Sequence, residues 1–248
     1  MDDSISSGEL RLSAHFAPPP PPGRALGLVL CHGLPNEPRG APAVGNTYPE
    51  LADRLAREAG WVVLTFNFRG TGTSEGDFSA SGWLDDVRAA VRVMDARDDV
   101  RGVWLAGFGH GGTFAACEAA DDPLVRGVAT IGAPSTLLDW ARDPGHLMQH
   151  ARDMGMIRAD GFPSDRAAWV REVARMDAVA AAARFGDRSM LVLHGVDDAE
   201  VSVVDARALA DAAGSIAELR LVQGGGHRLR HDPRAIATLI GWLDRQAT

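Results

Sequence analysis

The sequence predicts an α/β fold, a mostly parallel, doubly wound β-sheet covered by helices on both faces. Short apolar runs rich in β-branched residues alternate along the chain with amphipathic stretches. Strand–helix–strand units joined by short connections form parallel sheets of this kind. A glycine-dense turn at 107–112 joins one apolar run directly to a helical pattern. About fifty residues between Pro134 and Arg188 then show helical patterning without a convincing strand, more than a simple crossover needs.

The individual elements follow from hydrophobic periodicity and from turn residues. Strands are predicted at Leu10–Phe16, Ala25–Leu30, Trp61–Phe68, Gly102–Gly107, Val125–Ile131, Met190–His194 and Ala217–Val222. Helices are predicted at Pro49–Glu58, Leu84–Arg97, Gly111–Ala120, Val204–Ala213 and Ala235–Arg245. The five prolines Pro18–Pro22 predict a short polyproline II spacer.

The length of 248 residues fits one domain, residues 1–248. The helical insertion, at about 136–188, follows the carboxyl end of a strand. Ligands of open α/β sheets bind in a crevice at that edge. We therefore expect this insertion to form a small cap over a ligand site.

Charge and composition narrow the classes of function. The net charge is −8 and the pI is about 5.4, which disfavours binding to nucleic acid or to anionic membranes. No apolar run approaches the roughly 18 residues of a membrane span. The expected partner is a small molecule, and the sequence does not indicate an oligomeric state.

All 25 basic residues are arginine, which excludes Schiff-base chemistry and a P-loop lysine. The two cysteines, Cys31 and Cys117, are too few for a disulfide framework, and we expect both to be small buried residues. The first ten residues lack the basic and apolar regions of a signal peptide, so a cytoplasmic location is expected. No cofactor and no metal site is predicted.

The strongest local signal is the run from Val103 to Thr113, VWLAGFGHGGT. A strand enters a glycine-rich turn and continues into a helix, which is the setting of the G-x-S-x-G motif. Gly107 and Gly111 occupy the two flanking positions, where strand and helix pass too close for side chains. Gly109 occupies the central position, where the motif has serine.

Other segments fall in register with this turn. His32-Gly33 ends the first long strand, and the segment 68–76 reads FRGTGTSEG. His194-Gly195-Val-Asp-Asp198 ends a later strand, and Gly225-Gly226-His227 follows the last one.

Together these motifs resemble the α/β-hydrolase superfamily over nearly the whole chain. The resemblance is greatest to small bacterial hydrolases related to dienelactone hydrolases and to S33-type serine aminopeptidases. It implies acyl chemistry on an ester, thioester or amide. It also implies that His227 is a general base oriented by Asp198, and that the N–H groups of Leu34 and His110 bind an oxyanion. His32 is expected to make a structural hydrogen bond.

The resemblance supplies no nucleophile, because Gly109 has no side-chain oxygen. In the superfamily this strand–turn–helix segment, here residues 103–113, is called the nucleophile elbow. Acyl-enzyme turnover through the elbow is therefore excluded. Three functions stay open: a weak hydrolase in which His227 deprotonates a water, a lyase or isomerase that needs only a base, and a pseudoenzyme that binds a small molecule. The apparent retention of both His227 and Asp198 favours residual chemistry.

Some of these residues have competing interpretations. Gly107, Gly109 and Gly112 also satisfy G-x-G-x-x-G, the dinucleotide-binding motif, but no carboxylate ends the next strand, as that motif requires. Asp197 competes with Asp198 as the partner of His227, and the spacing from His194-Gly195 favours Asp198.

The predicted cap contributes candidate ligand contacts. Trp140 and Met148 belong to an apolar set that either packs the cap onto the sheet or lines the crevice for a partly hydrophobic ligand. Ser135 ends a strand on the ligand side and is a further candidate contact. His146 and His150 have the spacing of zinc ligands, but the glutamate of the zincin motif is missing, so we expect a surface or core pair.

Overall fold

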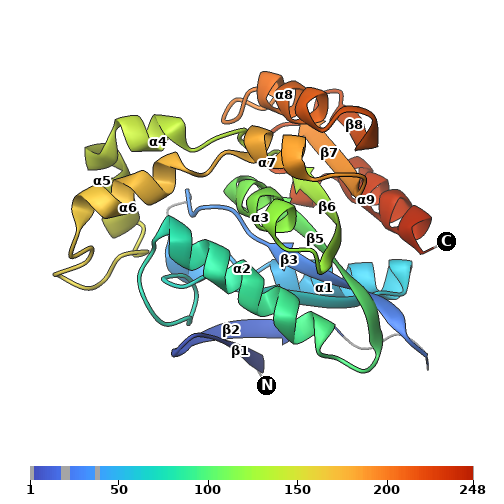
Figure 1. Cartoon of the computed structure of the whole chain (residues 1–248), viewed down its shortest axis with the longest axis horizontal. Coiled ribbons are helices and arrows are strands. Elements are labelled where there is room, and N and C mark those ends of the chain that lie inside the picture. The colour runs from blue at the N-terminus through green and yellow to red at the C-terminus, as the bar shows by residue number, and fades with distance from the viewer. Residues whose placement is uncertain (1–2, 18–22, 37–39, 248) are drawn as a thin grey trace.

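The computed structural model describes residues 3–17, 23–36 and 40–247, and these form one eight-stranded sheet with helices on both sides (Figure 1). The strands are β1 Asp3–Ser7, β2 Leu10–Phe16, β3 Ala25–Cys31, β4 Val62–Phe66, β5 Val100–Phe108, β6 Val125–Ile131, β7 Ser189–Gly195 and β8 Ala217–Val222. Their order across the sheet is β1-β2-β4-β3-β5-β6-β7-β8. The predicted fold class is confirmed. The predicted spacer Pro18–Pro22 lies outside the described residues.

Strands β3 to β8 run parallel, whereas β1 and β2 form an antiparallel hairpin that pairs with β4. The sequence analysis did not predict β1. In this edge strand only Ile5 and Ser7 are buried, so its sequence DSISS carries a single apolar residue. An edge strand with so little apolar surface has no periodic signal to detect.

The helices are α1 Tyr48–Ala59, α2 Ala80–Asp95, α3 His110–Asp121, α4 Leu138–Arg142, α5 Pro144–Asp153, α6 Arg166–Ala174, α7 Ala178–Arg184, α8 Val203–Ala213 and α9 Pro233–Gln246, with short 3-10 turns at Ala41–Ala43, Gly214–Ile216 and Leu229–His231. Helices α1 and α9 cover one face of the sheet, and α2, α3, α7 and α8 contribute to the core on the other.

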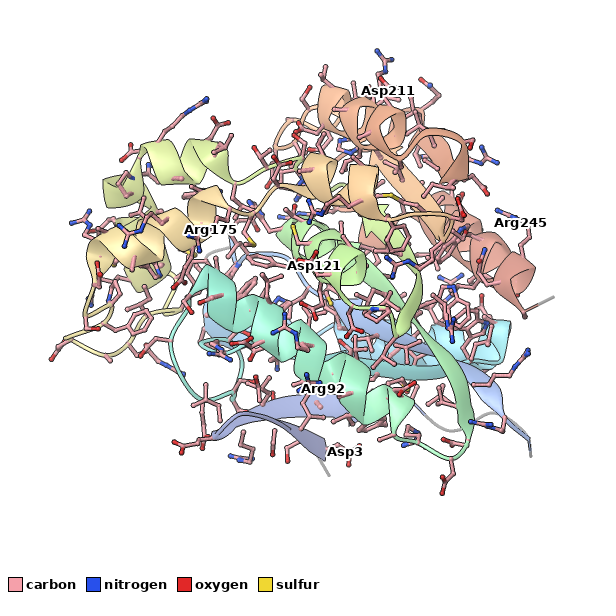
Figure 2. The ribbon with its side chains drawn as sticks, in the orientation of Figure 1. Asp3, Arg92, Asp121, Arg175, Asp211 and Arg245 are labelled. Carbon is pink, nitrogen blue, oxygen red and sulfur yellow. The ribbon has the colours of Figure 1, made fainter. Side chains whose placement is uncertain are left out.

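Strand β3 shows how the two cores divide. Leu28 and Leu30 belong to the core under α1 and α9, whereas Val29 and Cys31 belong to the opposite core. Because both faces are buried, the strand is apolar at nearly every position, as central parallel strands are. Charged side chains such as Arg92 on α2 and Asp211 on α8 project outward from the helices (Figure 2). In the described part of the chain, no helix is both long and apolar enough to span a membrane.

The segment 136–188 forms helices α4 to α7. Its ends are held together, because Leu137 N–H donates to Met176 O at 3.0 Å and Ala178 N–H donates to Ser135 O at 2.8 Å. Helix α7 packs against α3 and α8 as part of the helical layer. Helices α4 to α6 project as a unit from the carboxyl edge of the sheet (Figure 1). We call these three helices the cap.

Candidate active site

The turn between β5 and α3 places Gly109 at the carboxyl edge of the sheet. A Cβ atom on Gly107 would overlap the Gly111 carbonyl, and one on Gly111 would overlap the His32 carbonyl. Strand and helix therefore approach as closely as they do only because both residues are glycine. Gly109 itself has φ 53° and ψ −133°, a conformation that side chains strain to adopt.

Gly109 has space for a side chain despite this strain. The nearest atom to an ideal Cβ at Gly109 is His227 Nε2, at 3.5 Å, followed by His227 Cε1 at 3.8 Å and Gly33 Cα at 3.9 Å. These are ordinary van der Waals distances. The imidazole nitrogen of His227 thus faces the place where a serine at Gly109 would carry its hydroxyl.

His227 is held by the carboxylate of Asp198, and Nδ1 lies 2.9 Å from Oδ2. The other carboxylate oxygen of Asp198 accepts the N–H groups of Glu200 and Val201, each at 2.9 Å. Asp198 is fully buried at its side chain, whereas Asp197 is exposed. The structure therefore pairs His227 with Asp198.

Hydrogen bonding assigns the proton on the His227 ring. A carboxylate can only accept, so Nδ1 carries a hydrogen, and in the neutral ring Nε2 presents its lone pair towards Gly109. His194 lies behind the pair, with Nε2 donating to Val201 O at 3.0 Å and lying 3.6 Å from Asp198 Oδ2. A base with a fixed tautomer thus faces the elbow.

Leu34 and His110 both line the cavity, as does Gly109. The loop that carries Leu34 is close to the elbow, since an ideal Cβ on Gly33 would lie 3.0 Å from Phe108 O and 3.6 Å from His110 N. Neither the Leu34 N–H nor the His110 N–H has an acceptor among the described residues. Both donors are available to a ligand.

The His110 side chain is part of a contact between the elbow and the cap. Trp140 Nε1–H donates to His110 Nε2 at 3.1 Å, so that nitrogen is unprotonated. Burial, with smaller contributions from the nearby His227 and His150 rings, lowers the pKa of His110 to about 3. His110 is therefore neutral at physiological pH and positions Trp140 over the cavity.

The cap also contacts the loop of Leu34. His150 on α5 donates from Nε2 to Pro35 O at 2.9 Å, and burial lowers its pKa. His146, one turn earlier on the same helix, is exposed. His146 and His150 therefore differ in role, although their spacing is that of zinc ligands. Of the two, only His150 fixes the loop beside Leu34.

We expect a His150→Ala variant to loosen the segment 33–36 and to weaken any oxyanion contact made by the Leu34 N–H. Amide hydrogen exchange at Leu34 should speed up, and the rate of any reaction that uses the Leu34 N–H as an oxyanion donor should fall about tenfold, less than the roughly 10²–10³ lost with a whole oxyanion donor. Gln149→Ala, on the exposed side of α5, should change neither quantity. Equal effects of the two substitutions would contradict this role for His150.

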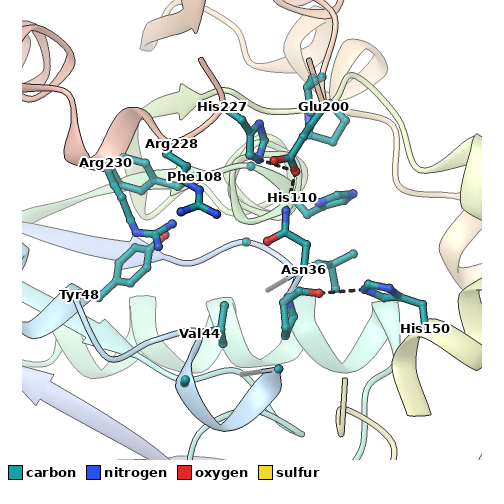
Figure 3. A pocket seen from close by; sticks show the side chains of 18 of the residues that line it. Asn36, Val44, Tyr48, Phe108, His110, His150, Glu200, His227, Arg228 and Arg230 are labelled. Carbon is teal, nitrogen blue, oxygen red and sulfur yellow. Dashed lines mark hydrogen bonds and ion pairs between the residues drawn. The ribbon is translucent and has the colours of Figure 1, made fainter. Parts of the chain in front are cut away.

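A cavity of about 460 Å³ lies above Gly109 and extends beneath the cap (Figure 3). Its lining includes Leu34, His110, His227 and the aromatic residues Tyr48, Phe108 and Trp140. Among the described residues, no three His, Cys, Asp or Glu side chains gather in a way that could hold a metal ion.

Comparison with known proteins places this arrangement in a family. The family model for the alpha/beta hydrolase fold matches residues 28–227, most of the chain and every segment of the site. The chain belongs to the α/β hydrolase family. No curated protein sequence matches it.

Solved structures share the fold of this α/β hydrolase at low sequence identity. Est1E from Butyrivibrio proteoclasticus, with ferulic acid bound, is 16% identical, with 98% of this chain and 97% of Est1E covered and a TM-score of 0.74. The Pyrococcus furiosus esterase Pf2001 is 14% identical, with 100% and 91% covered and a TM-score of 0.72. The α/β hydrolase GrgF from Penicillium sp. sh18 is 17% identical, with 100% and 98% covered and a TM-score of 0.74.

Two candidate contacts do not line the cavity of this α/β hydrolase. The Ser135 hydroxyl donates a short hydrogen bond to Asp205 at the start of α8, and Met148 packs against the core. Of the three predicted ligand contacts, Trp140, Met148 and Ser135, only Trp140 lies on the cavity.

The sequence analysis missed several polar residues of the cavity, namely Asn36, Tyr48, Glu200, Arg228 and Arg230. Arg230 lies with its guanidinium carbon 5.9 Å from the Tyr48 ring centroid (Figure 3). Proximity to Asp198 and to His227 in the sequence could have indicated Glu200 and Arg228. Nothing local marks Asn36 or Tyr48, which tertiary contacts bring to the site.

Proposed function

We propose that this α/β hydrolase hydrolyses small, partly hydrophobic acyl esters by direct attack of a water molecule that occupies the space above Gly109. The observation that carries the proposal is the 3.5 Å between His227 Nε2 and the Cβ position of Gly109. A base aimed at the space left by a missing serine side chain can act on a water there instead.

In the proposed reaction the water oxygen attacks the carbonyl carbon while His227 Nε2 takes one of its protons. The carbonyl electron pair moves to the oxygen, where the Leu34 and His110 N–H groups stabilise the negative charge. Asp198 stabilises the imidazolium that forms. The intermediate then collapses, and the leaving alcohol takes the proton from His227, giving a carboxylic acid and an alcohol.

No cysteine or serine among the described residues lines the cavity to replace the missing nucleophile. Burial raises the pKa of both cysteine thiols, to about 11 for Cys117, and neither Cys31 nor Cys117 lines the cavity. The Ser135 hydroxyl is bound to Asp205. Covalent acyl transfer to a cysteine or to Ser135 is therefore not supported, which favours a one-step hydrolysis.

The lining favours an ester with an apolar or aromatic acyl or alcohol group, because Tyr48, Phe108 and Trp140 contribute flat surfaces. Pf2001 is an esterase, which agrees with ester chemistry on this fold, and Est1E holds ferulic acid, an aromatic carboxylic acid. The motif resemblance to dienelactone hydrolases and S33-type aminopeptidases extends the candidate substrates to lactones and amides.

The test is hydrolysis of p-nitrophenyl esters of short acids by the purified protein. General-base catalysis contributes about 10²–10⁴, so we expect a slow steady rate without an initial burst. A fluorophosphonate should not label the protein. His227→Ala should abolish the activity, whereas Ser135→Ala should leave it unchanged.

Two outcomes would contradict the proposal. Stoichiometric fluorophosphonate labelling would reveal a nucleophile that the geometry does not provide. The absence of any hydrolysis above the His227→Ala background would make a small-molecule-binding protein the better description, since Gly109 removes the family's nucleophile.

A further inference from the structure

Glu200 reaches the same space as His227 from the loop after β7. Its Oε2 lies 3.8 Å from His227 Nε2, the nitrogen that faces Gly109. The side chain is 48% exposed and lines the cavity. Figure 3 shows the carboxylate and the imidazole turned towards each other.

Two hydrogen bonds, one to the side chain and one from the backbone, fix the position of Glu200. Asn36 donates from Nδ2 to Glu200 Oε2 at 2.5 Å, so the loop that carries Leu34 holds the acid from the far side. The backbone N–H of Glu200 donates to Asp198 Oδ1 at 2.9 Å. Glu200 is therefore anchored both to the oxyanion-side loop and to the carboxylate that orients His227.

The separation of 3.8 Å is too long for a direct hydrogen bond, which needs about 2.7–3.2 Å. One water molecule can bridge two polar groups at this separation and donate to each. Such a water would lie beside Gly109, where the ideal Cβ position is 3.5 Å from the same nitrogen.

A water and a serine hydroxyl differ in what they need from a site. A serine oxygen is held by its covalent bond and has one hydrogen, so one acceptor suffices. A free water has two hydrogens and no tether, so only hydrogen bonds can hold it. Replacing the serine by water therefore calls for a second acceptor beside His227.

We propose that Glu200 is this second acceptor and a catalytic residue for the hydrolytic water. The inference rests on the proposed function. The water donates one hydrogen to His227 Nε2 and the other to Glu200 Oε2, which leaves a lone pair directed at the substrate carbonyl. His227 removes the first proton during the attack, and the second stays on the oxygen and leaves with the acid product.

The test compares Glu200→Gln with Asp197→Asn. Asp197 is an exposed carboxylate of the same loop, and its substitution removes the same charge without touching His227. Hydrolysis of p-nitrophenyl esters should fall 10- to 100-fold in Glu200→Gln, mainly in kcat, and stay unchanged in Asp197→Asn. Glu200→Ala should lose at least as much activity as Glu200→Gln.

The same substitution in a Gly109→Ser background separates catalysis from structure. A tethered hydroxyl does not need the second acceptor, so Glu200→Gln should change the rate of the acylation burst by less than about threefold. A residue that merely supports the fold would slow both enzymes alike.

Equal rates for Glu200→Gln and Asp197→Asn in an active protein would overturn the role of Glu200 alone. So would equal losses on adding Glu200→Gln to the wild-type protein and to the Gly109→Ser variant. If the wild-type protein hydrolyses no ester at all, the proposed function fails and this inference fails with it. In a crystal structure, we expect a water within about 3 Å of both His227 Nε2 and Glu200 Oε2.

Discussion

A Gly109→Ser variant should be labelled stoichiometrically by a fluorophosphonate and should hydrolyse p-nitrophenyl esters with an initial burst. The added Cβ would lie 3.5 Å from His227 Nε2, so the hydroxyl comes within reach of a base that Asp198 already orients. The proposed oxyanion donors are the Leu34 and His110 N–H groups. Acyl-enzyme would then form faster than it hydrolyses, which gives the burst.

We expect the rate of ester cleavage to rise by about 10²–10⁴. In subtilisin, loss of the serine costs about 2 × 10⁶ in kcat, and a site not adapted to the hydroxyl should regain only part of this. The backbone at Gly109, with φ 53°, should cost the variant roughly 1–3 kcal/mol of stability. Burst kinetics, mass spectrometry of the labelled protein and thermal melting measure these three quantities.

Gly109→Ala is the matched control, because it introduces the same backbone strain without an oxygen. It should melt at nearly the same temperature as Gly109→Ser and remain unlabelled. A folded Gly109→Ser protein that neither labels nor cleaves esters would show that the His227–Asp198 pair or the oxyanion donors do not function.

Stability should fall steeply as the pH drops from 7 to 5, because two histidines are held neutral in the fold. Phe68 N–H donates to His32 Nε2 at 3.3 Å, and Trp140 donates to His110 Nε2, so neither nitrogen can carry a proton without losing its donor. Burial lowers the pKa of His32 to about 4 and that of His110 to about 3.

Proton linkage determines the direction in which the stability changes with pH. Below about pH 6.5 the unfolded chain takes up a proton at each histidine, whereas the native state does not until about pH 4 or 3. Their stabilising contribution is thus complete above about pH 6.5 and is lost as the pH falls. Each group changes the free energy of unfolding by up to about 1.4 kcal/mol per pH unit, which amounts to roughly 2 kcal/mol per histidine between pH 7 and pH 5.

Urea unfolding at half-unit pH steps would measure this slope. His110→Gln keeps an acceptor for Trp140 but does not titrate, so its stability should depend less on pH in this range. His146→Gln, at an exposed position, should reproduce the wild-type slope. A wild-type stability that stays flat between pH 7 and pH 5 would contradict neutral burial of His32 and His110.

The amino-acid sequence by itself determined the α/β architecture and the chemistry of the elbow. Central strands such as β3 are apolar at nearly every position, and this composition alone indicates that both of their faces are buried. Gly107 and Gly111 mark a close approach that any side chain would prevent. Gly109 excludes a serine mechanism at that position whatever its surroundings. These conclusions rest on local backbone conformation and on residue type, which the sequence states directly. The edge strand β1 escaped detection because it buries too few apolar side chains.

Only the tertiary structure decided which polar side chains meet. Asp197 and Asp198 are adjacent in sequence, but the turn after β7 buries one beside His227 and exposes the other. Ser135 lies in the loop after β6, and Asp205 from α8 binds its hydroxyl. Asn36 and Glu200 are separated by 164 residues and still share a hydrogen bond. Such contacts depend on how distant loops pack at the edge of the sheet, and no periodicity or motif within either loop encodes the partner.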